Sequence, residues 1–426
     1  MNKRTKTALR RWCLYGWTFA KWTMAASAIG VVCGLIGTMF HFGVHEVTAF
    51  RGTHPWVLYL LPLAGFVIVS FYKLTETDGL GTDDIIDAVH EGKRLPILLL
   101  PAIFFGTVLT HLCGGSAGRE GAALQMGGTI GQCMGRTFRL DDRDLRVATL
   151  AGMAAFFSAL FGTPLAATVF AIMVISIGVI YHVALYPSLL AALVAYGVSV
   201  RLGVEPTRFT VAVPDQSVGM FVRVAALGVL CALVSILFCK LMHGAGHLMK
   251  RIKNPWLRVI CGGFTVIALT WIFGTDYNGA GMDVVTRAIE QETVAVPWAF
   301  LLKLVFTAVT LAAGFKGGEV VPSFFVGATF GCAVSPLLGL PVGFGAAVGL
   351  AAVFCGVTNC PVASTLLAVE LFGAEGMLYF ALACCLSYML SGYQGLYSSQ
   401  TILYSKLKAQ FINVHTNAYH AGEKTE

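Results

Sequence analysis

The chain has 426 residues, of which 12% are Asp, Glu, Lys or Arg and 57% are hydrophobic, with a mean hydropathy of +0.76. Soluble domains are about 25% charged, so this composition leaves most helices without a polar face and excludes a soluble enzyme, a disordered chain and a nucleic-acid-binding protein. The net charge of +7 comes in part from Lys3, Arg4, Lys6, Arg10 and Arg11, which precede the first apolar run and predict a cytoplasmic N-terminus at residues 1–21.

Apolar segments then follow one another with few interruptions. They cover about 22–48, 55–72, 95–112, 145–200, 217–242, 255–274, 296–313 and 320–395. The first is long enough for the ~20 residues that a membrane span needs, which favours a membrane helix over a cleaved signal peptide. Segments 79–89, 114–131 and 317–331 begin with glycines and are short, which predicts discontinuous helices that end inside the bilayer.

The two halves of the chain share residues at a fixed spacing. The segment Asp78–Asp83 (DGLGTD) and the segment Asn278–Asp283 (NGAGMD) lie 200 positions apart. The same offset superposes Thr107 on Thr307, Gly118 on Gly318, Gly127 on Gly327 and Gly131 on Gly331. We therefore predict a duplication, with transmembrane repeat 1 at 22–205, repeat 2 at 215–404 and a short cytoplasmic tail at 405–426.

Charge placement predicts how the halves are oriented. Basic residues precede the first helix of repeat 1, whereas Lys250, Arg251, Lys253 and Arg258 follow the corresponding helix of repeat 2, at about 219–245. If both clusters are cytoplasmic, the two helices run in opposite directions. The sequence thus predicts an all-α polytopic membrane protein of two inverted repeats, with a substrate site where the repeats meet, as in transporters and channels.

A glycine-rich segment from Gly114 to Gly127 opens one of the short helices and carries Glu120 in its first turn. Free N–H groups at a helix N-terminus bind anions, and the helix dipole adds to this. Ionised Glu120 would occupy such a site as a tethered anion, and protonation would release the site to a mobile anion. The alternative is that Glu120 only caps the helix and pairs with Arg119. An acid inside the membrane indicates function by default.

Three separated motifs resemble the CLC family of chloride channels and anion/proton antiporters. Gly118–Ala122 (GREGA) is similar to its GREGP segment, Gly318–Pro322 (GEVVP) is similar to its GxFxP segment, and Tyr397 matches its late anion-coordinating tyrosine. The resemblance extends from the first helix to Tyr397. It implies the CLC fold, with inverted repeats, and a homodimer with one pore per subunit.

By this resemblance Glu120 is the external gating glutamate, and the main-chain amides around Val320 and Val321 coordinate the anion together with the Tyr397 hydroxyl. The other anion-site residues that we expect at these helix starts are Gly118, Arg119, Gly121 and Phe324. The positive ring edge of Phe324 can face an anion, and a position in the core is the alternative.

Departures from the chloride-type pattern narrow the function. Leu80 replaces a serine whose hydroxyl would bind the anion, and Val174, ten residues after Pro164, replaces the internal proton-transfer glutamate. Glu319 is then the candidate for proton coupling, and a buried ion pair with Arg119 is the alternative. These features resemble the CLC-F branch of fluoride/proton antiporters, which lacks both residues, generally has methionine where Leu80 stands, and has a GGEV segment.

We therefore predict a secondary active antiporter that exports cytoplasmic fluoride in exchange for external protons. It would be a homodimer in the plasma (inner) membrane with both termini cytoplasmic. Fluoride is strongly hydrated, so strong donors must offset its dehydration. The alternatives are a chloride/proton antiporter, a passive anion channel and, from another class, a membrane enzyme or sensor. We expect no cofactor, no metal site, no nucleic-acid partner and no enzymatic activity.

Overall fold

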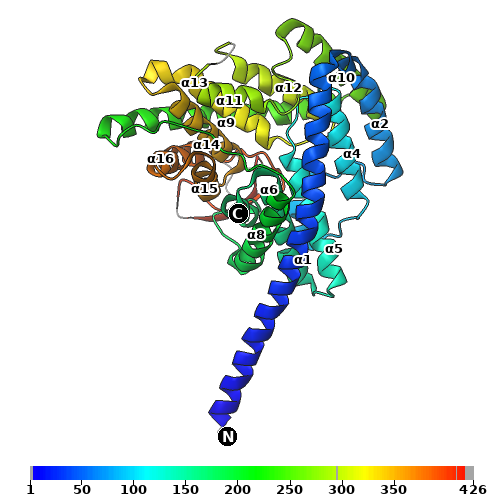
Figure 1. The fold of residues 1–426 in the computed structure, drawn as a ribbon, viewed down its shortest axis with the longest axis vertical. Helices are drawn as coiled ribbons and strands as arrows, with labels where there is room; N and C mark the ends of the chain where they lie inside the picture. Colours follow the sequence, from blue (N-terminus) through cyan, green and yellow to red (C-terminus); the bar gives the residue numbers. More distant parts are fainter. Residues whose placement is uncertain (1–2, 294–295, 409, 418–426) are drawn as a thin grey trace.

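The computed structural model describes residues 3–293, 296–408 and 410–417, and helices make up most of this range (Figure 1). The helices of the first half are α1 (Lys3–Thr53), α2 (Leu61–Leu74), α3 (Thr82–Glu91), α4 (Leu99–Leu112), α5 (Glu120–Thr137), α6 (Asp142–Phe161), α7 (Pro164–Met173) and α8 (Leu185–Arg201). Those of the second half are α9 (Val218–Met249), α10 (Pro255–Phe273), α11 (Met282–Glu290), α12 (Ala299–Ala313), α13 (Val320–Leu338), α14 (Val342–Thr358), α15 (Pro361–Phe372) and α16 (Met377–Leu390). Two 3-10 turns, η1 (Pro55–Leu60) and η2 (His182–Ala184), precede α2 and α8.

The membrane class is confirmed, because seven helices of the described residues are long and apolar enough to cross a bilayer. The longest is α1, whose N-terminal end projects well beyond the bundle (Figure 1). The basic N-terminal residues belong to the same helix as the first apolar run, because α1 continues through residue 21 without a break, and residues 11–20 are exposed along its projecting part.

Helix boundaries repeat along the chain, as the glycine spacing predicts. Starts 200 positions apart relate α3 to α11, α4 to α12, α5 to α13 and α6 to α14. After an offset change to 197, Pro164 and Pro361 open α7 and α15, where the missing N–H of proline leaves no helical bond unmade. Gly162 and Asn359, also 197 apart, end α6 and α14 in the left-handed conformation, with φ of 69° and 62°.

The contacts of α2 and α10 show that the equivalent helices run in opposite directions. At one end, the ammonium of Lys73 lies 3.8 Å from the ring centroid of Trp256, which joins the end of α2 to the start of α10. At the other end, the Trp271 Nε1–H donates to the Tyr59 hydroxyl at 3.3 Å, which joins the end of α10 to η1 before α2. The repeats are therefore inverted, and the basic segment that precedes α10 lies on the same side as the end of α2.

Glycines bring helices into backbone contact in the same way in both halves. A Cβ on Gly127 of α5 would lie 2.3 Å from the Gly152 oxygen of α6, and one on Gly327 of α13 would lie 2.4 Å from the Gly349 oxygen of α14. Small residues permit this close approach between membrane helices. The tight packing holds α5 and α13 rigidly, and each begins at the place where the repeats meet.

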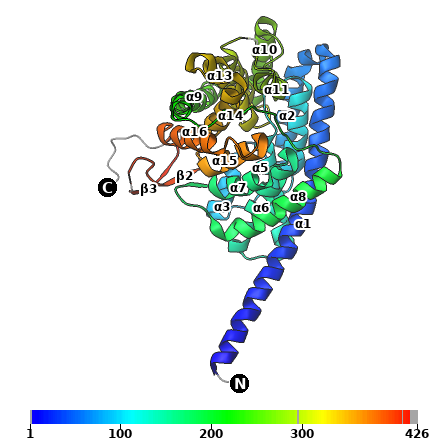
Figure 2. The same cartoon turned by 60° about the vertical axis from the view of Figure 1, so that its left-hand side comes forward.

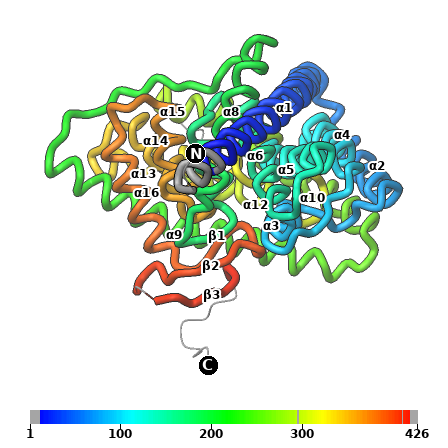
Figure 3. The backbone as a smooth tube through the Cα atoms, turned by 90° about the horizontal axis from the view of Figure 1, so that it is seen from below, coloured from blue at the N-terminus to red at the C-terminus, as the bar shows by residue number. Residues whose placement is uncertain are grey.

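Two features of the backbone differ from the sequence-based expectation. The glycine-led segments were expected to stop at residues 131 and 331, but α5 continues to Thr137 and α13 to Leu338. The tail also contains structure, since β2 (Thr401–Tyr404) pairs in parallel with β1 (Ser176–Ile177) and antiparallel with β3 (Phe411–His415). Figure 3 shows this small sheet at the edge of the face from which α1 projects.

Candidate anion and proton site

The starts of α5 and α13 meet at a pair of glycines. Gly118 N–H donates to the Gly318 oxygen at 2.7 Å, and Gly318 N–H donates to the Gly118 oxygen at 2.8 Å. No space remains for a side chain at Gly318, because a Cβ there would lie 2.2 Å from the Gly121 nitrogen. The glycines therefore let two helix N-termini from the two repeats converge on one small volume.

Gly118 lies at this convergence without a free N–H group, because its N–H is donated to the Gly318 oxygen. The N–H groups of Gly121, Val320 and Val321 belong to the first turns of α5 and α13, where no carbonyl of the same helix can accept from them. Pro322, which comes next, has no N–H, so Val320 and Val321 supply the amides of α13.

Glu120 lies at this convergence and is fully buried. Its Oε2 accepts a hydrogen bond from the Arg119 N–H at 2.9 Å, and the Val321 N–H also faces the carboxylate. Its Oε1 has no hydrogen-bond partner among the described residues. The carboxylate thus lies where two helix N-termini converge, with part of its bonding capacity unused.

Arg119 compensates the charge of Glu120 only in part. Its Nε lies 3.6 Å from Glu120 Oε1, which is longer than a hydrogen bond, and its Nη1 contacts His41 Nδ1 at 3.0 Å. The alternative that Arg119 pairs with Glu319 is not realised, since Glu319 forms no ion pair with any residue of the described segments. Glu319 is therefore an acid without a compensating cation.

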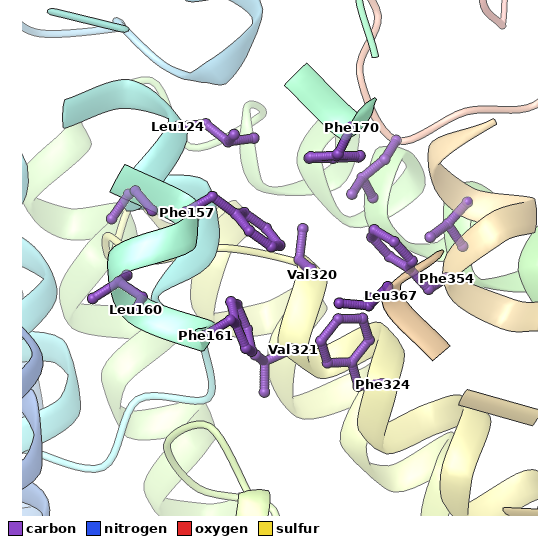
Figure 4. Close-up of a cluster of buried hydrophobic side chains, with 14 of the residues drawn as sticks. Leu124, Phe157, Leu160, Phe161, Phe170, Val320, Val321, Phe324, Phe354 and Leu367 are labelled. Carbon is purple, nitrogen blue, oxygen red and sulfur yellow. The ribbon is translucent and has the colours of Figure 1, made fainter. Parts of the chain in front are cut away.

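Side chains at the start of α13 enter a cluster of buried aromatic rings (Figure 4). Phe324 is 1% exposed, and its ring centroid lies 5.9 Å from that of Phe161 and 5.1 Å from that of Phe354. The apolar side chains of Val320 and Val321 point into the same cluster. Phe324 therefore packs in the core, and its ring is fixed by neighbours from both repeats.

Leu80, Glu319 and Tyr397 line one cavity of about 260 Å³. It reaches the surface at Gly79, which is exposed, next to the start of α3. In Figure 2, α3 lies in the lower half of the bundle, towards the end from which α1 projects. The cavity thus brings Leu80, Glu319 and Tyr397 together near the N-termini of α5 and α13, although these residues are far apart in the sequence.

Within this cavity, Tyr397 supplies a donor and Leu80 does not. The Tyr397 hydroxyl is buried and has no hydrogen-bond partner among the described residues. Its backbone is held in place, because its carbonyl accepts from the Gln400 N–H and from the Thr416 hydroxyl. Leu80 contributes only carbon, and its N–H is donated to the Thr77 oxygen at 3.2 Å. The cavity therefore offers a fixed phenol opposite an apolar wall.

The position of the missing internal glutamate is closed. Val174 is fully buried, and its carbonyl accepts from Gln400 Nε2 at 2.8 Å. The third acid of the apolar runs, Glu370, caps α7: its two oxygens accept from the Leu165 and Ala166 N–H groups at 3.1 and 2.8 Å. Neither residue lines the cavity, whereas Glu319 lines it from the start of α13 and Asp83 and Asp84 line it from the start of α3.

Sequence reasoning missed two residues of the cavity wall, Lys316 and Tyr72. A lysine three residues before Glu319 in a glycine-rich segment was a usable signal, because ionisable residues at membrane depth are seldom neutral to function. Tyr72 gave no signal, since it sits in an apolar helix among other aromatic residues. Among the described residues, no group of three or more His, Cys, Asp or Glu side chains is placed to hold a metal ion.

Comparison with known proteins adds independent information. A family model described as voltage gated chloride channel matches residues 63–392. A chloride/fluoride channel protein of Pseudomonas syringae pv. tomato is 39% identical over 399 residues, which are 91% of this chain and 88% of that protein. The crystal structure of a CLC-type fluoride/proton antiporter matches with a TM-score of 0.88 and 32% identity, over 91% of this chain and 99% of that one. A slow cyanobacterial Cl⁻/H⁺ antiporter shares the fold, with a TM-score of 0.75 and 20% identity over 87% of this chain and 94% of the other.

Proposed function

Because the chain belongs to the CLC family, we propose that it is a secondary active antiporter that exports cytoplasmic fluoride in exchange for external protons. The observation that carries this proposal is the position of Glu120. Its buried carboxylate lies at the converging starts of α5 and α13, within reach of their amides and with one oxygen unpartnered. A carboxylate and a fluoride ion are both anionic acceptors, so they compete for the same donors.

Protonation of Glu120 is the step that couples the two ions. The ionised carboxylate is held by charge-assisted hydrogen bonds at the helix starts. The neutral acid loses most of this attraction, leaves the amides and makes room for fluoride. When fluoride has passed, the carboxylate returns and gives up its proton. A proton that enters from outside is thereby exchanged for a fluoride ion that comes from the cytoplasm.

The cavity supports fluoride as the anion. Dehydrating a small, strongly hydrated ion requires strong donors, which the Tyr397 hydroxyl and the amides of Val320 and Val321 supply. Leu80 contributes a bulky apolar side chain to the cavity wall, which excludes a larger or hydrated ion. Fluoride therefore moves from the cavity, past Tyr397, to the helix starts, and chloride is disfavoured by its size.

Glu319 transfers the proton from Glu120 towards the cytoplasm. It lines the cavity, forms no ion pair within the described residues, and its Oε2 lies near Gly121 at the start of α5. It is thus placed between Glu120 and the open end of the cavity. Val174 and Glu370 do not provide an alternative, because the first has no acidic group and the second is fixed as a helix cap.

The orientation and assembly complete the proposal. The basic residues at the start of α1 and those between α9 and α10 support a cytoplasmic location for both of these regions, and the cavity is then the cytoplasmic entrance in a plasma (inner) membrane. The protein works as a homodimer with one pore per subunit. Cross-linking in native membranes tests the dimer, and a protein that stays monomeric there contradicts it.

The test is exchange in proteoliposomes. We expect an outward fluoride gradient to drive protons inward, with both fluxes recorded by electrodes, and we expect Glu120→Gln to abolish the proton flux. A reversal potential that shifts with pH separates an antiporter from a passive channel. Efflux of fluoride and chloride from the same vesicles separates the two antiporter types. Fluoride efflux without proton movement in the wild-type protein would refute the proposal.

A further inference from the structure

The arginine cavity is a hollow of about 250 Å³ between the end of α3, the end of α5 and the start of α6. Arg94, Arg136 and Arg146 line it together with apolar residues such as Ala88 and Leu145. None of its lining residues belongs to the cavity near the N-termini of α5 and α13. It is therefore separate from the proposed route of the anion and the proton.

The arginine cavity lies on the side of the molecule from which α1 projects. The Lys21 ammonium donates to the Asp144 carboxylate, which ties the start of α6 to the place where α1 leaves the bundle. In Figure 2, α3 and α6 lie in the lower half of the bundle, towards the same end. The first turn of α6, a helix long and apolar enough to cross a bilayer, lines the cavity. The cavity thus lies at a membrane surface, within reach of lipid headgroups.

A buried glutamine fixes the wall of the cavity. Gln132 is 3% exposed, and its Oε1 accepts from Arg136 and from the Leu95 N–H, the latter at 2.8 Å. Its Nε2 donates to the Lys93 oxygen at 2.9 Å. These bonds hold the segment that carries Arg94 against α5. The arginines are therefore positioned before any ligand binds, which lowers the entropic cost of binding.

The arginines have hydrogen-bonding capacity that the protein does not use. The Nε of Arg146 is buried and has no hydrogen-bond partner among the described residues. None of Arg94, Arg136 and Arg146 forms an ion pair within the described segments. A buried charged donor without an acceptor is costly, so a ligand that accepts hydrogen bonds from these groups is favoured.

The nearby acids do not cancel this charge. Asp142 lines the cavity, is exposed at its rim and forms no ion pair with a described residue, so three positive charges face one negative charge. Asp144 is engaged by Lys21, and Asp84 is engaged by Lys93 at 2.9 Å. Three further acids of these elements do not line the cavity: Asp87, Glu91 and Asp141.

Exposed apolar side chains flank the arginine cavity. Ile97 and Leu98 directly precede α4 and are 64% and 51% exposed, and Phe138 directly follows α5 and is 44% exposed. They come shortly after Arg94 and Arg136 in the chain. The acyl chains of a lipid would pack on such side chains, whereas a free phosphate ion would make no contact with them. This apolar border favours a lipid over a soluble anion.

We propose that the arginine cavity binds the phosphate of an anionic phospholipid, taken from the leaflet on the side from which α1 projects. A guanidinium group matches two oxygens of a phosphate with parallel hydrogen bonds, and basic pockets between membrane helices bind anionic headgroups. The excess of positive charge selects an anionic headgroup over a zwitterionic one. The bound lipid joins the ends of α3 and α5 to the start of α6. This inference does not depend on which ion the protein transports.

Native mass spectrometry of the full-length protein in detergent micelles tests the site, because it counts bound lipids and gives their Kd. The probes are dioctanoyl phosphatidylglycerol, dioctanoyl phosphatidylcholine and inorganic phosphate. We expect one phosphatidylglycerol per chain to bind about tenfold more tightly than phosphatidylcholine, as for one added charge-assisted interaction. We expect inorganic phosphate at the same concentration to leave this lipid bound.

Substitutions separate a defined site from a general attraction to the basic surface. We expect Arg94→Gln, Arg136→Gln and Arg146→Gln each to raise the Kd for phosphatidylglycerol roughly tenfold, as for the loss of a charge-assisted hydrogen bond. Arg143→Gln is the matched control and should keep the wild-type Kd, since Arg143 is an exposed residue of the same turn of α6 as Asp142 but does not line the cavity. Arg94 is also exposed, so its replacement disturbs no packing and keeps the test decisive if a variant of a more buried arginine fails to fold.

Three results would overturn the proposal. Equal Kd values for the two lipids would show that the cavity does not select an anionic headgroup. An equal loss of affinity in Arg143→Gln and Arg94→Gln would show only diffuse attraction to the surface. Displacement of phosphatidylglycerol by an equal concentration of inorganic phosphate would show that the ligand is a free phosphate and not a lipid.

Discussion

Gly118 and Gly318 hold each other through two backbone hydrogen bonds across the interface of the repeats. The pseudo-twofold axis that relates the two repeats thus passes between two equivalent glycines. Each glycine comes two residues before the first residue of its helix, α5 or α13. The geometry of the proposed anion site, which is built from those two helix starts, depends on this pair.

Substitution by alanine is expected to have different effects at Gly118 and at Gly318. A Cβ on Gly118 would lie 2.5 Å from Glu120 Oε2, the end of a flexible side chain, whereas a Cβ on Gly318 would lie 2.2 Å from a backbone nitrogen. We expect Gly118→Ala to fold but to exchange fluoride for protons with a lower ratio, because its methyl group displaces the carboxylate. We expect Gly318→Ala to lower the thermal unfolding temperature, since overpacking costs about 1–3 kcal/mol or more.

Gly197→Ala on α8 is the control for both, because no atom lies within 4 Å of its Cβ. It should match the wild type in exchange ratio, and its melting temperature should be no lower, because alanine is favoured over glycine inside a helix. An unchanged exchange ratio in Gly118→Ala contradicts the assigned position of the Glu120 carboxylate.

Replacing Glu319 by glutamine tests its role in proton transfer. Glutamine keeps the shape but carries no transferable proton, so we expect the proton flux to fall by roughly 100-fold or more, with fluoride movement less affected. Glu370→Gln is the matched comparison. It weakens the cap on α7 at a cost of about 1–2 kcal/mol, and the exchange ratio should stay at the wild-type value. Equal proton fluxes in Glu319→Gln and the wild type would exclude Glu319 from the route.

Replacing Leu80 by a polar residue is expected to change the preference between chloride and fluoride. Leu80→Ser removes the bulky apolar side chain from the cavity that also contains Tyr397 and leaves room for a larger ion, so we expect the chloride flux to rise relative to the fluoride flux. Leu80→Met keeps the wall apolar, and we expect it to preserve the wild-type preference. Paired electrode measurements of both anions in the same vesicle preparation give the ratio. An identical ratio in the serine variant removes Leu80 from the explanation of selectivity.

The repeat, the inversion and the glycine-led helix starts were predictable from the sequence because they depend on local chemistry. Glycine at 118 and 318, proline at 164 and 361, and basic residues beside α1 and α10 each carry a physical meaning without any partner. The ends of α5 and α13 were predicted too early, since glycines within a buried helix serve close packing and do not end it.

Long-range contacts explain what was missed. The strand Thr401–Tyr404 is short and acquires its partner from Ser176–Ile177, more than 200 positions away in the chain. The hydrogen bonds between Gly118 and Gly318 join residues 200 positions apart in the chain. Lys316 and Tyr72 become a pair only because Gly106 leaves room between α4 and the segment before α13. None of these relations is encoded by neighbouring residues.

The hairpin of β2 and β3 is attached through Lys406, which lies outside the membrane-spanning segments. Its ammonium donates to the Asn359 side chain at the end of α14, and to the Tyr388 oxygen and the Ser391 hydroxyl at the end of α16. All of these acceptors are uncharged. Burial without a counterion lowers the pKa of Lys406 to about 7. Docking of the hairpin also holds Tyr397, because Thr416 donates to the Tyr397 carbonyl.

This depressed pKa predicts that docking strengthens as pH rises. Between the docked value of about 7 and the ordinary lysine value of 10.5, the undocked hairpin binds a proton that the docked one lacks, so docking gains stability with increasing pH in this window and loses it as pH falls towards 7. Below about pH 7 both forms are protonated and the dependence ends. Amide hydrogen exchange in residues 401–408 and 410–417, corrected for its intrinsic pH dependence, should show more protection at about pH 9 than at about pH 6. The exposed Lys408 provides the control. We expect Lys408→Met to keep the difference in protection between the two pH values and Lys406→Met to lose it. Equal protection of the wild type at both pH values would show that Lys406 docks in its charged form.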